Sequence, residues 1–292
     1  MKPRILQLLV FVLLVGAWGF AKAEEHRGLG LEPLKLYDNF EQVPINPDKW
    51  VGSQFESPPR FGGSFLELVR KTTQEEHHLR ILNRSVGQTF FNGGISLSLF
   101  RLGFTRPDSI TAIRSRVQVR NAESTGCPDA LNPTPTLATA QIFGFFFNTG
   151  TPTPESGGFL DVIAGVQVQR RSNSLDPPDI LEISYFVEHC SDFDCVGSSP
   201  LGGGSLGTVK KGEWVRLLLQ WDSAQHRFIF QRDTQPQKFV TYQGFSDTAA
   251  PGIQLKTLGA DNFIANCTSF PRPVGVSDAL FDNVFVNQSA LP

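Results

Sequence analysis

Charge is scarce in this 292-residue chain, and that scarcity excludes several classes of partner. Charged residues make up 18% of the chain, and the formal net charge is −2. So weak a charge gives no bulk field that would recruit nucleic acid or an anionic membrane surface. Apolar runs long enough to cross a bilayer, which takes roughly 20 residues, are also lacking. We therefore expect no nucleic-acid partner and no membrane insertion.

The longest apolar stretch lies near the N-terminus and is shorter than a membrane span. It covers residues 5–15, follows Lys2 and Arg4, and precedes the small-residue site Ala21-Lys22-Ala23. A basic start, a short apolar stretch and a site of this kind are typical of a secretory signal peptide. We expect cleavage after residue 23 and a secreted or periplasmic protein.

Cysteine is sparse, with four residues in the whole chain. An exported chain meets an oxidising compartment, so two disulfides are expected. Of the three possible pairings, sequence spacing favours Cys190–Cys195 together with Cys127–Cys267. Zinc is the alternative, but a structural zinc site needs paired ligands at both ends. Neither Cys127 nor Cys267 has a close Cys or His neighbour.

Helical periodicity is missing from the rest of the chain, which instead alternates apolar and polar residues between turn signals. This pattern is typical of an all-β sandwich or barrel. We expect a polar lead-in at 24–35 and a single β-sandwich domain at 36–292. The predicted strands are 65–70, 77–83, 94–102, 109–121, 138–148, 160–171, 180–189, 213–222, 226–233, 238–243, 253–258 and 279–287.

Residues 212–233 predict a hairpin with one dry and one wet face. Folding about Ser223-Ala224 places Leu219 opposite Phe228 and Leu217 opposite Phe230. Successive side chains of a strand point to opposite sides of a sheet, so these four share a face. The other face carries Arg216, Gln220, Arg227 and Gln231.

A second hairpin is predicted by folding 160–171 onto 180–189. Its register places Val168 opposite Ile183 on the dry face. A slip of one residue would bury Glu182, so the register is well specified. The wet face then carries Gln167 and Gln169 opposite Ser184 and Glu182.

A third ribbon, residues 109–120, has the same form. Its apolar face holds Ile113, Val117 and Val119. Three such ribbons predict a large antiparallel sheet with a polar outer surface. The polar face of this ribbon carries Arg114, Arg116, Gln118 and Arg120.

Three segments together resemble the concanavalin A-like lectin/glucanase (LamG-like jelly-roll) superfamily. "LYDNFEQVPINPDKW" (36–50) is similar to its opening strand, residues 212–233 to a late hairpin, and "ALFDNVFVN" (279–287) to the closing strand that lies beside the first. The resemblance implies a jelly roll of two curved antiparallel sheets. In many members the concave sheet binds glycans. No characterised subfamily is identified.

The resemblance also implies a structural calcium, held partly by an aspartate of the closing strand. Asp282, with Asp38 nearby if the terminal strands pair, is the candidate set. Calcium prefers six to eight oxygen ligands, most of which would be backbone carbonyls. The alternative is that both aspartates are edge or turn-capping residues. No other cofactor is expected.

Catalytic motifs of related enzymes are incomplete here. The glucanase pattern E-x-D-x-x-E is missing, and Asp179 and Glu182 lie on opposite sides of their strand. Alginate lyases of similar form use an Arg-rich strand and a Gln-x-His strand. Residues 115–120 supply the arginines, but Phe143 replaces the histidine two positions after Gln141.

Two further features indicate structure rather than chemistry. His77 and His78 are adjacent on a strand and so point to opposite sides. Gly202-Gly203-Gly204 lacks the lysine and helix of a phosphate-binding loop, and we expect a flexible connection there.

The sequence therefore predicts an exported, monomeric carbohydrate-binding domain without a recognisable catalytic motif. Arginine forks match carboxylate and sulfate groups, so an anionic glycan is a possible ligand. The alternatives are a polysaccharide lyase acting on an acidic glycan and a structural or adhesive envelope protein. The predicted ligand-binding residues are Arg114, Arg116, Arg120, Gln167, Gln169 and Glu182.

Overall fold

The protein is all-β in the part of the chain that its computed structural model describes. Strands alternate with loops and three short 3₁₀ turns, and no described helix is long and apolar enough to span a membrane. The predicted signal peptide, and the strand predicted at 65–70 except for its last two residues, lie outside the described residues. The structure describes residues 32–52, 69–90, 92–128, 132–153 and 155–291.

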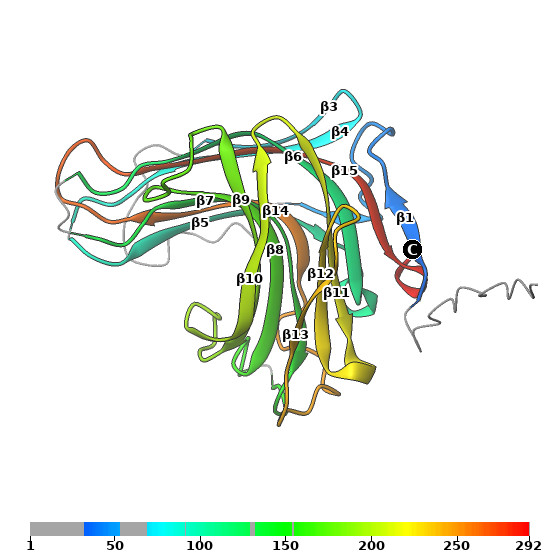
Figure 1. Ribbon diagram of the computed structural model, residues 1–292. Helices are drawn as coiled ribbons and strands as arrows, with labels where there is room; N and C mark the ends of the chain where they lie inside the picture. The colour runs from blue at the N-terminus through cyan, green and yellow to red at the C-terminus, as the bar shows by residue number, and fades with distance from the viewer. Residues whose placement is uncertain (1–31, 53–68, 91, 129–131, 154, 292) are drawn as a thin grey trace, which may run out of the picture. The chain divides into compact units, whose positions relative to one another are not determined.

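The first sheet is centred on the last strand, β15 (Val274–Asn287). β6 (Ala112–Ser124) pairs along one side of β15, while β4 (His78–Val86) and β1 (Leu34–Asp38) share the other side. The opening and closing strands therefore lie side by side, as Figure 1 shows. The sheet is extended by β3 (Val69–Glu75) beside β4, and by β11 (Trp214–Asp222), β12 (Arg227–Arg232) and β13 (Lys238–Thr241) beyond β6.

The second sheet packs against the first and is also antiparallel throughout. Its central strands are long, so one face can support an extended site. In sheet order the strands are β10 (Ser198–Lys210), β9 (Ile180–Cys190), β8 (Asp161–Arg171), β7 (Leu137–Asn148), β14 (Lys256–Ala265), β5 (Ile95–Phe104) and β2 (Trp50–Val51).

The core lies between the inward faces of the two sheets. Leu217 and Phe230 of the first sheet, and Val168 and Ile183 of the second, have exposed fractions of 1% or less. Fully burying one such side chain contributes roughly 1.5–3 kcal/mol. Apolar residues therefore alternate inward along each strand, and the predicted sandwich of two antiparallel sheets is confirmed.

The hairpin predicted at 160–171 and 180–189 forms in the predicted register, with Val168 opposite Ile183. The hairpin at 212–233 forms two residues out of register, with Leu219 opposite Phe230 and Trp221 opposite Phe228. Its turn takes four residues instead of two, because Ser223–Gln225 form a 3₁₀ turn and His226 adopts a left-handed backbone. A shift of two preserves which face each side chain occupies.

The predicted flexible connection at Gly202-Gly203-Gly204 is wrong, because these glycines lie within strand β10. A Cβ on Gly203 would lie 2.7 Å from the carbonyl oxygen of Tyr185, and one on Gly202 would lie 2.7 Å from Val240. Glycine is therefore needed for the close approach of neighbouring chains.

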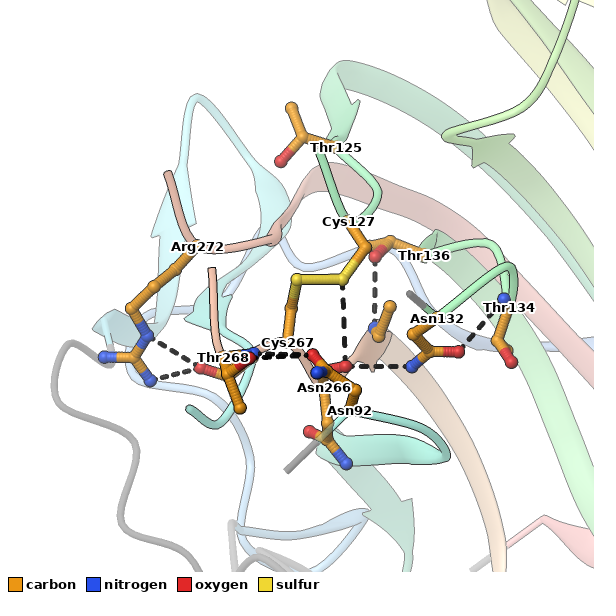
Figure 2. The surroundings of a disulfide bond; sticks show 12 residues. Asn92, Thr125, Cys127, Asn132, Thr134, Thr136, Asn266, Cys267, Thr268 and Arg272 are labelled. Carbon is orange, nitrogen blue, oxygen red and sulfur yellow. Dashed lines mark hydrogen bonds between the residues drawn. A yellow bond between two sulfur atoms is a disulfide. The ribbon is translucent and has the colours of Figure 1, made fainter. Parts of the chain in front are cut away.

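Both predicted disulfides form, Cys127–Cys267 and Cys190–Cys195. The first joins two loops that are 140 residues apart in sequence. Figure 2 shows Asn132 beside it, where the amide donates to the carbonyl oxygen of Asn266 at 2.9 Å. The second closes a short loop at the end of β9.

Candidate ligand-binding groove

A groove of about 830 Å³ lies on the outer face of the second sheet. Its floor is formed by strands β5, β14, β7, β8 and β9, and the segments 194–198 and 253–255 border it. This volume falls within the roughly 300–1,000 Å³ typical of small-molecule sites. The length of the central strands thus provides a surface that can take an extended ligand.

Three glutamines, which we call the amide row, cross the middle of the groove floor. Gln141 lies opposite Gln167 on neighbouring strands, and Gln169 lies two positions along β8 from Gln167. Their exposed fractions are 2%, 8% and 1%, respectively. Polar side chains so deeply placed need hydrogen-bond partners, and those partners determine how each amide is oriented.

Carboxylates orient two of the three glutamines of the amide row, since an ionised carboxylate can only accept hydrogen bonds. The Nε2 of Gln141 donates to Asp261, and the Nε2 of Gln169 donates to the Oε2 of Glu182 at 2.7 Å. The Nε2 of Gln167 donates to the Oε1 of Gln169 at 2.8 Å and to the hydroxyl of Ser184 at 3.2 Å. Each amide nitrogen of the row therefore donates at least one hydrogen bond within the protein.

Two carbonyl oxygens of the amide row have no donor among the described residues. These are the Oε1 atoms of Gln141 and Gln167, which belong to facing residues on adjacent strands. Each can accept a hydrogen bond from a ligand. The centre of the groove is thus an acceptor surface suited to hydroxyl or N–H groups.

Asp261 and Arg101 form a buried ion pair beside the amide row. The Nε of Arg101 lies 2.8 Å from Oδ2 of Asp261, whose Oδ1 accepts from the backbone N–H of Phe100 at 3.1 Å. The guanidinium also lies 4.3 Å from the ring centroid of Phe143. A Cβ on Gly259 would meet Arg101 at 2.7 Å, so glycine lets the arginine lie flat on the sheet.

Three phenylalanines, which we call the aromatic wall, flank the amide row on one side. Phe143 and Phe145 are buried and contact edge to face, whereas Phe186 is only partly buried. The ring of Phe186 covers Gly165 on the neighbouring strand, because a Cβ there would lie 2.6 Å from the ring. The glycine therefore allows an apolar ring to lie over the sheet beside the polar row.

One end of the groove is acidic and is bordered by the loop of the short disulfide. Glu188 lies on β9, and its carboxylate accepts from the hydroxyl of Ser198 at 2.6 Å. Asp194 lies within the loop that Cys190–Cys195 closes. The backbone N–H groups of Val196 and Gly197 donate to Asp192 at 2.8 and 2.6 Å, which fixes the loop's return to β10.

The six predicted ligand-binding residues do not share one surface. Gln167, Gln169 and Glu182 lie in the groove, on β8 and β9 of the second sheet. Arg114, Arg116 and Arg120 lie on the outer face of β6 in the first sheet, which the core separates from the groove. The prediction of one large polar sheet face is therefore wrong, because alternation separates wet from dry positions but does not assign a strand to a sheet.

The arrangement expected of a lyase is also divided between the sheets. Gln141 and Phe143 lie in the groove, whereas the arginines of residues 115–120 lie on the opposite sheet. Tyr185 packs inward on Phe230, with ring centroids 4.6 Å apart. The predicted arginine and Gln-x-Phe elements therefore cannot act on one substrate group.

Glu182 and Glu188 share the groove face of β9, but six positions separate them. At about 3.3 Å per residue they lie about 20 Å apart. Paired glycosidase carboxylates lie roughly 5–9.5 Å apart, so these two glutamates do not form such a pair.

Asp38 and Asp282 contact donors that compete with a cation. The carboxylate of Asp38 accepts from the indole Nε1 of Trp50 at 2.7 Å and from the backbone of Phe40 at 2.9 Å. Asp282 accepts from Arg116 at 3.3 Å and from the backbone of its neighbour at 2.7 Å. Among the described residues no cluster of three or more His, Cys, Asp or Glu could hold a metal. Both carboxylates already accept hydrogen bonds from protein donors, an arrangement that does not fit calcium ligands. The calcium site stays a prediction.

Sequence reasoning missed Arg101, Asp261 and Phe186 as groove residues. Asp261 was missed because β14 was predicted at 253–258, whereas it covers Lys256–Ala265. A usable signal was Gln141, a polar residue at an outward position in the largely apolar strand β7.

Known structures that are similar to this chain share little sequence with it. A β-1,3-glucanase from Mycobacterium marinum is 12% identical with a TM-score of 0.41, over 86% of this chain and 98% of that one. A carbohydrate-binding module, CBM66, from Bacillus subtilis is 10% identical with a TM-score of 0.33, over 76% and 92%. An alginate lyase from Aplysia kurodai is 14% identical with a TM-score of 0.35, over 76% and 90%. No protein-family model and no curated protein sequence matches the chain. Similarity this distant assigns neither a ligand nor a reaction.

Proposed function

We propose that the groove binds a neutral carbohydrate chain. The observation that carries the proposal is the amide row, in which the carbonyl oxygens of Gln141 and Gln167 have no donor among the described residues. Sugar hydroxyls are such donors. A chain of sugars would also match a groove that is long, open and only partly polar.

The aromatic wall supports the same ligand class. Phe186 lies on β9, next to the amide row, and its side chain is partly exposed. A pyranose ring carries C–H groups on its faces and hydroxyls at its edge, so one sugar can contact both surfaces. Sites of this kind combine an apolar lining with a few fixed polar groups.

Charge disfavours an anionic ligand in the groove. Arg101 is neutralised by Asp261, and the Nε of Arg171 lies 3.9 Å from a carboxylate oxygen of Glu182. Glu188 adds negative charge at one end. The proposal therefore differs from the anionic glycan that the sequence offered as one candidate ligand.

Calorimetric titration against neutral polysaccharides, namely β-glucans, mannans and galactans, tests the proposal. We expect saturable binding to at least one of them. Phe186→Ala should weaken that binding about tenfold, since an aromatic contact contributes on the order of 1 kcal/mol beyond its buried area. The matched control is Phe239→Ala, which removes a 46%-exposed phenylalanine from β13 of the other sheet.

Several results would overturn the proposal. These are a lack of binding to every neutral polymer, or an equal loss in the Phe186→Ala and Phe239→Ala variants. A uronate polymer included in the panel tests the lyase alternative, because elimination creates an unsaturated sugar whose ultraviolet absorbance rises with time. Rising absorbance would contradict a binding-only role.

A further inference from the structure

The outer face of the first sheet concentrates arginines on two neighbouring strands. Arg114 and Arg116 lie on β6, and Arg216 lies directly opposite Arg116 on β11. Like charges directly opposite one another destabilise a sheet. We call Arg114, Arg116 and Arg216 the arginine cluster.

Acidic partners neutralise the cluster only in part. The Nη1 of Arg116 lies 3.3 Å from the Oδ2 of Asp282. Within the described parts of the chain, no carboxylate forms an ion pair with the side chain of Arg114 or Arg216. The nearby carboxylate of Asp233 accepts from the backbone N–H of Arg216 at 2.9 Å, but its charge is paired with Arg232 at 3.3 Å. Three guanidinium groups against the one remaining carboxylate leave a local charge of +2.

Arg114 has an unmet hydrogen-bonding demand. Its Nε is buried and has no hydrogen-bond partner among the residues described. The pKa of Arg114 is lowered, first by burial and then by the charge of Arg216. An unpaired buried donor is costly, but an Nε that solvent does not reach is also closed to an anion, so an anion would bind Arg114 through its Nη groups.

Aromatic rings support two of the guanidinium groups. The Cζ of Arg114 lies 4.3 Å from the ring centroid of Phe285, and that of Arg116 lies 4.7 Å from the ring centroid of Trp214. Stacking on a ring restrains a guanidinium while leaving its N–H edge free to bind oxygen. The cluster is thus partly preorganised for an anion.

We propose that the arginine cluster is a binding site for a dianionic tetrahedral oxyanion, namely sulfate or phosphate. A dianion would balance the local charge of +2, whereas a single carboxylate would leave half of it. One arginine guanidinium can donate two parallel N–H hydrogen bonds to two oxygens of such an anion. The site lies on the sheet opposite the groove, so it is distinct from the proposed carbohydrate site.

The test is calorimetry with inorganic sulfate, inorganic phosphate and a sugar phosphate monoester at constant ionic strength, with acetate as the monoanion. We expect saturable binding of at least one dianion and no saturable binding of acetate. The phosphate and monoester arms distinguish a free anion from a phosphate carried on a sugar. Trp214 fluorescence should change with the same midpoint, because its ring contacts Arg116.

Matched variants separate a site from diffuse attraction. Arg216→Gln should weaken dianion binding about tenfold, since charge-assisted hydrogen bonds are strong. Arg120→Gln removes the same charge from the same face, but Arg120 is already paired with Glu75 at 2.9 Å, so we expect less than about a twofold change. Arg114→Lys keeps the positive charge but removes the planar, bidentate guanidinium donors, and should also weaken binding.

Equal losses in the Arg216→Gln and Arg120→Gln variants, or a lack of dianion binding by the unmodified protein, would overturn the proposal. Phe186→Ala should leave dianion binding unchanged. A failure of the carbohydrate proposal is therefore distinguishable from a failure of this one. Unfolding temperatures of all variants confirm that they are folded.

Discussion

At the scale of single residues, Lys256 shows how an ionisable side chain can be held in the interior. Its exposed fraction is 2%, and its Nζ donates to the carbonyl oxygen of Phe145 at 2.8 Å. The Nζ also lies 4.8 Å from the ring centroid of Phe146. Burial lowers the pKa of Lys256 to about 7, because desolvation disfavours the ammonium.

Lys256 predicts a pH dependence of stability. The unfolded lysine keeps a pKa near about 10.4, so between pH 7 and that value the unfolded state binds more protons than the folded state. The free energy of unfolding should therefore rise with pH in this window, by up to roughly 1.4 kcal/mol per pH unit. Lys256→Met should remove this rise, whereas Lys210→Met, at an exposed position, should retain it. Denaturant unfolding from pH 7 to 9 measures both slopes, and parallel slopes in the two variants would contradict the assignment.

At the scale of strands and loops, the two disulfides should differ in their contribution to stability. Cys127–Cys267 closes a loop of 140 residues and Cys190–Cys195 one of 5. Loop-closure entropy alone gives about 5 and about 2 kcal/mol, respectively. We expect replacement of the first pair by serine to lower the free energy of unfolding by more than replacement of the second. Denaturant titration of the two double variants measures this, and a larger loss at Cys190–Cys195 would contradict it.

Most strands could be predicted from alternation, but the pairing of strands that are distant in sequence could not. The hairpin register of β8 and β9 followed from Glu182, which a slip would have buried. β14 was misplaced because Asn262 points inward, where its Nδ2 donates to the carbonyl oxygen of Asn83 and to the hydroxyl of Ser85. A buried asparagine with partners about 180 residues away breaks the local apolar pattern.

The candidate site was predicted in part for the same reason. Gln167, Gln169 and Glu182 belong to one hairpin, so local pairing brought them together. Gln141 and Asp261 join these residues in the groove only because β7 pairs with β8 on one side and with β14 on the other. Such pairings between distant segments are set by packing of the whole sandwich and leave no short-range signal.

At the scale of the whole molecule, charge is divided between the two outer faces. The chain carries a formal net charge of −2. The groove is neutral to acidic, while the arginine cluster on the opposite sheet is locally cationic. A molecule with little net charge therefore presents two surfaces of different charge, which the core keeps apart.

This division predicts that salt affects binding to the two surfaces to different extents. Exposed charges are screened over about 10 Å at 0.1 M salt and about 3 Å at 1 M, whereas hydrogen bonds to neutral hydroxyls carry no net charge to screen. Raising sodium chloride from about 0.05 to about 0.5 M should change the dissociation constant of a neutral glycan less than about twofold. The same change should weaken dianion binding about tenfold, since chloride also competes for the guanidinium groups. Calorimetric titrations at both salt concentrations measure the two responses. If glycan binding weakened as strongly as dianion binding, the glycan would be held by the arginine cluster rather than by the groove.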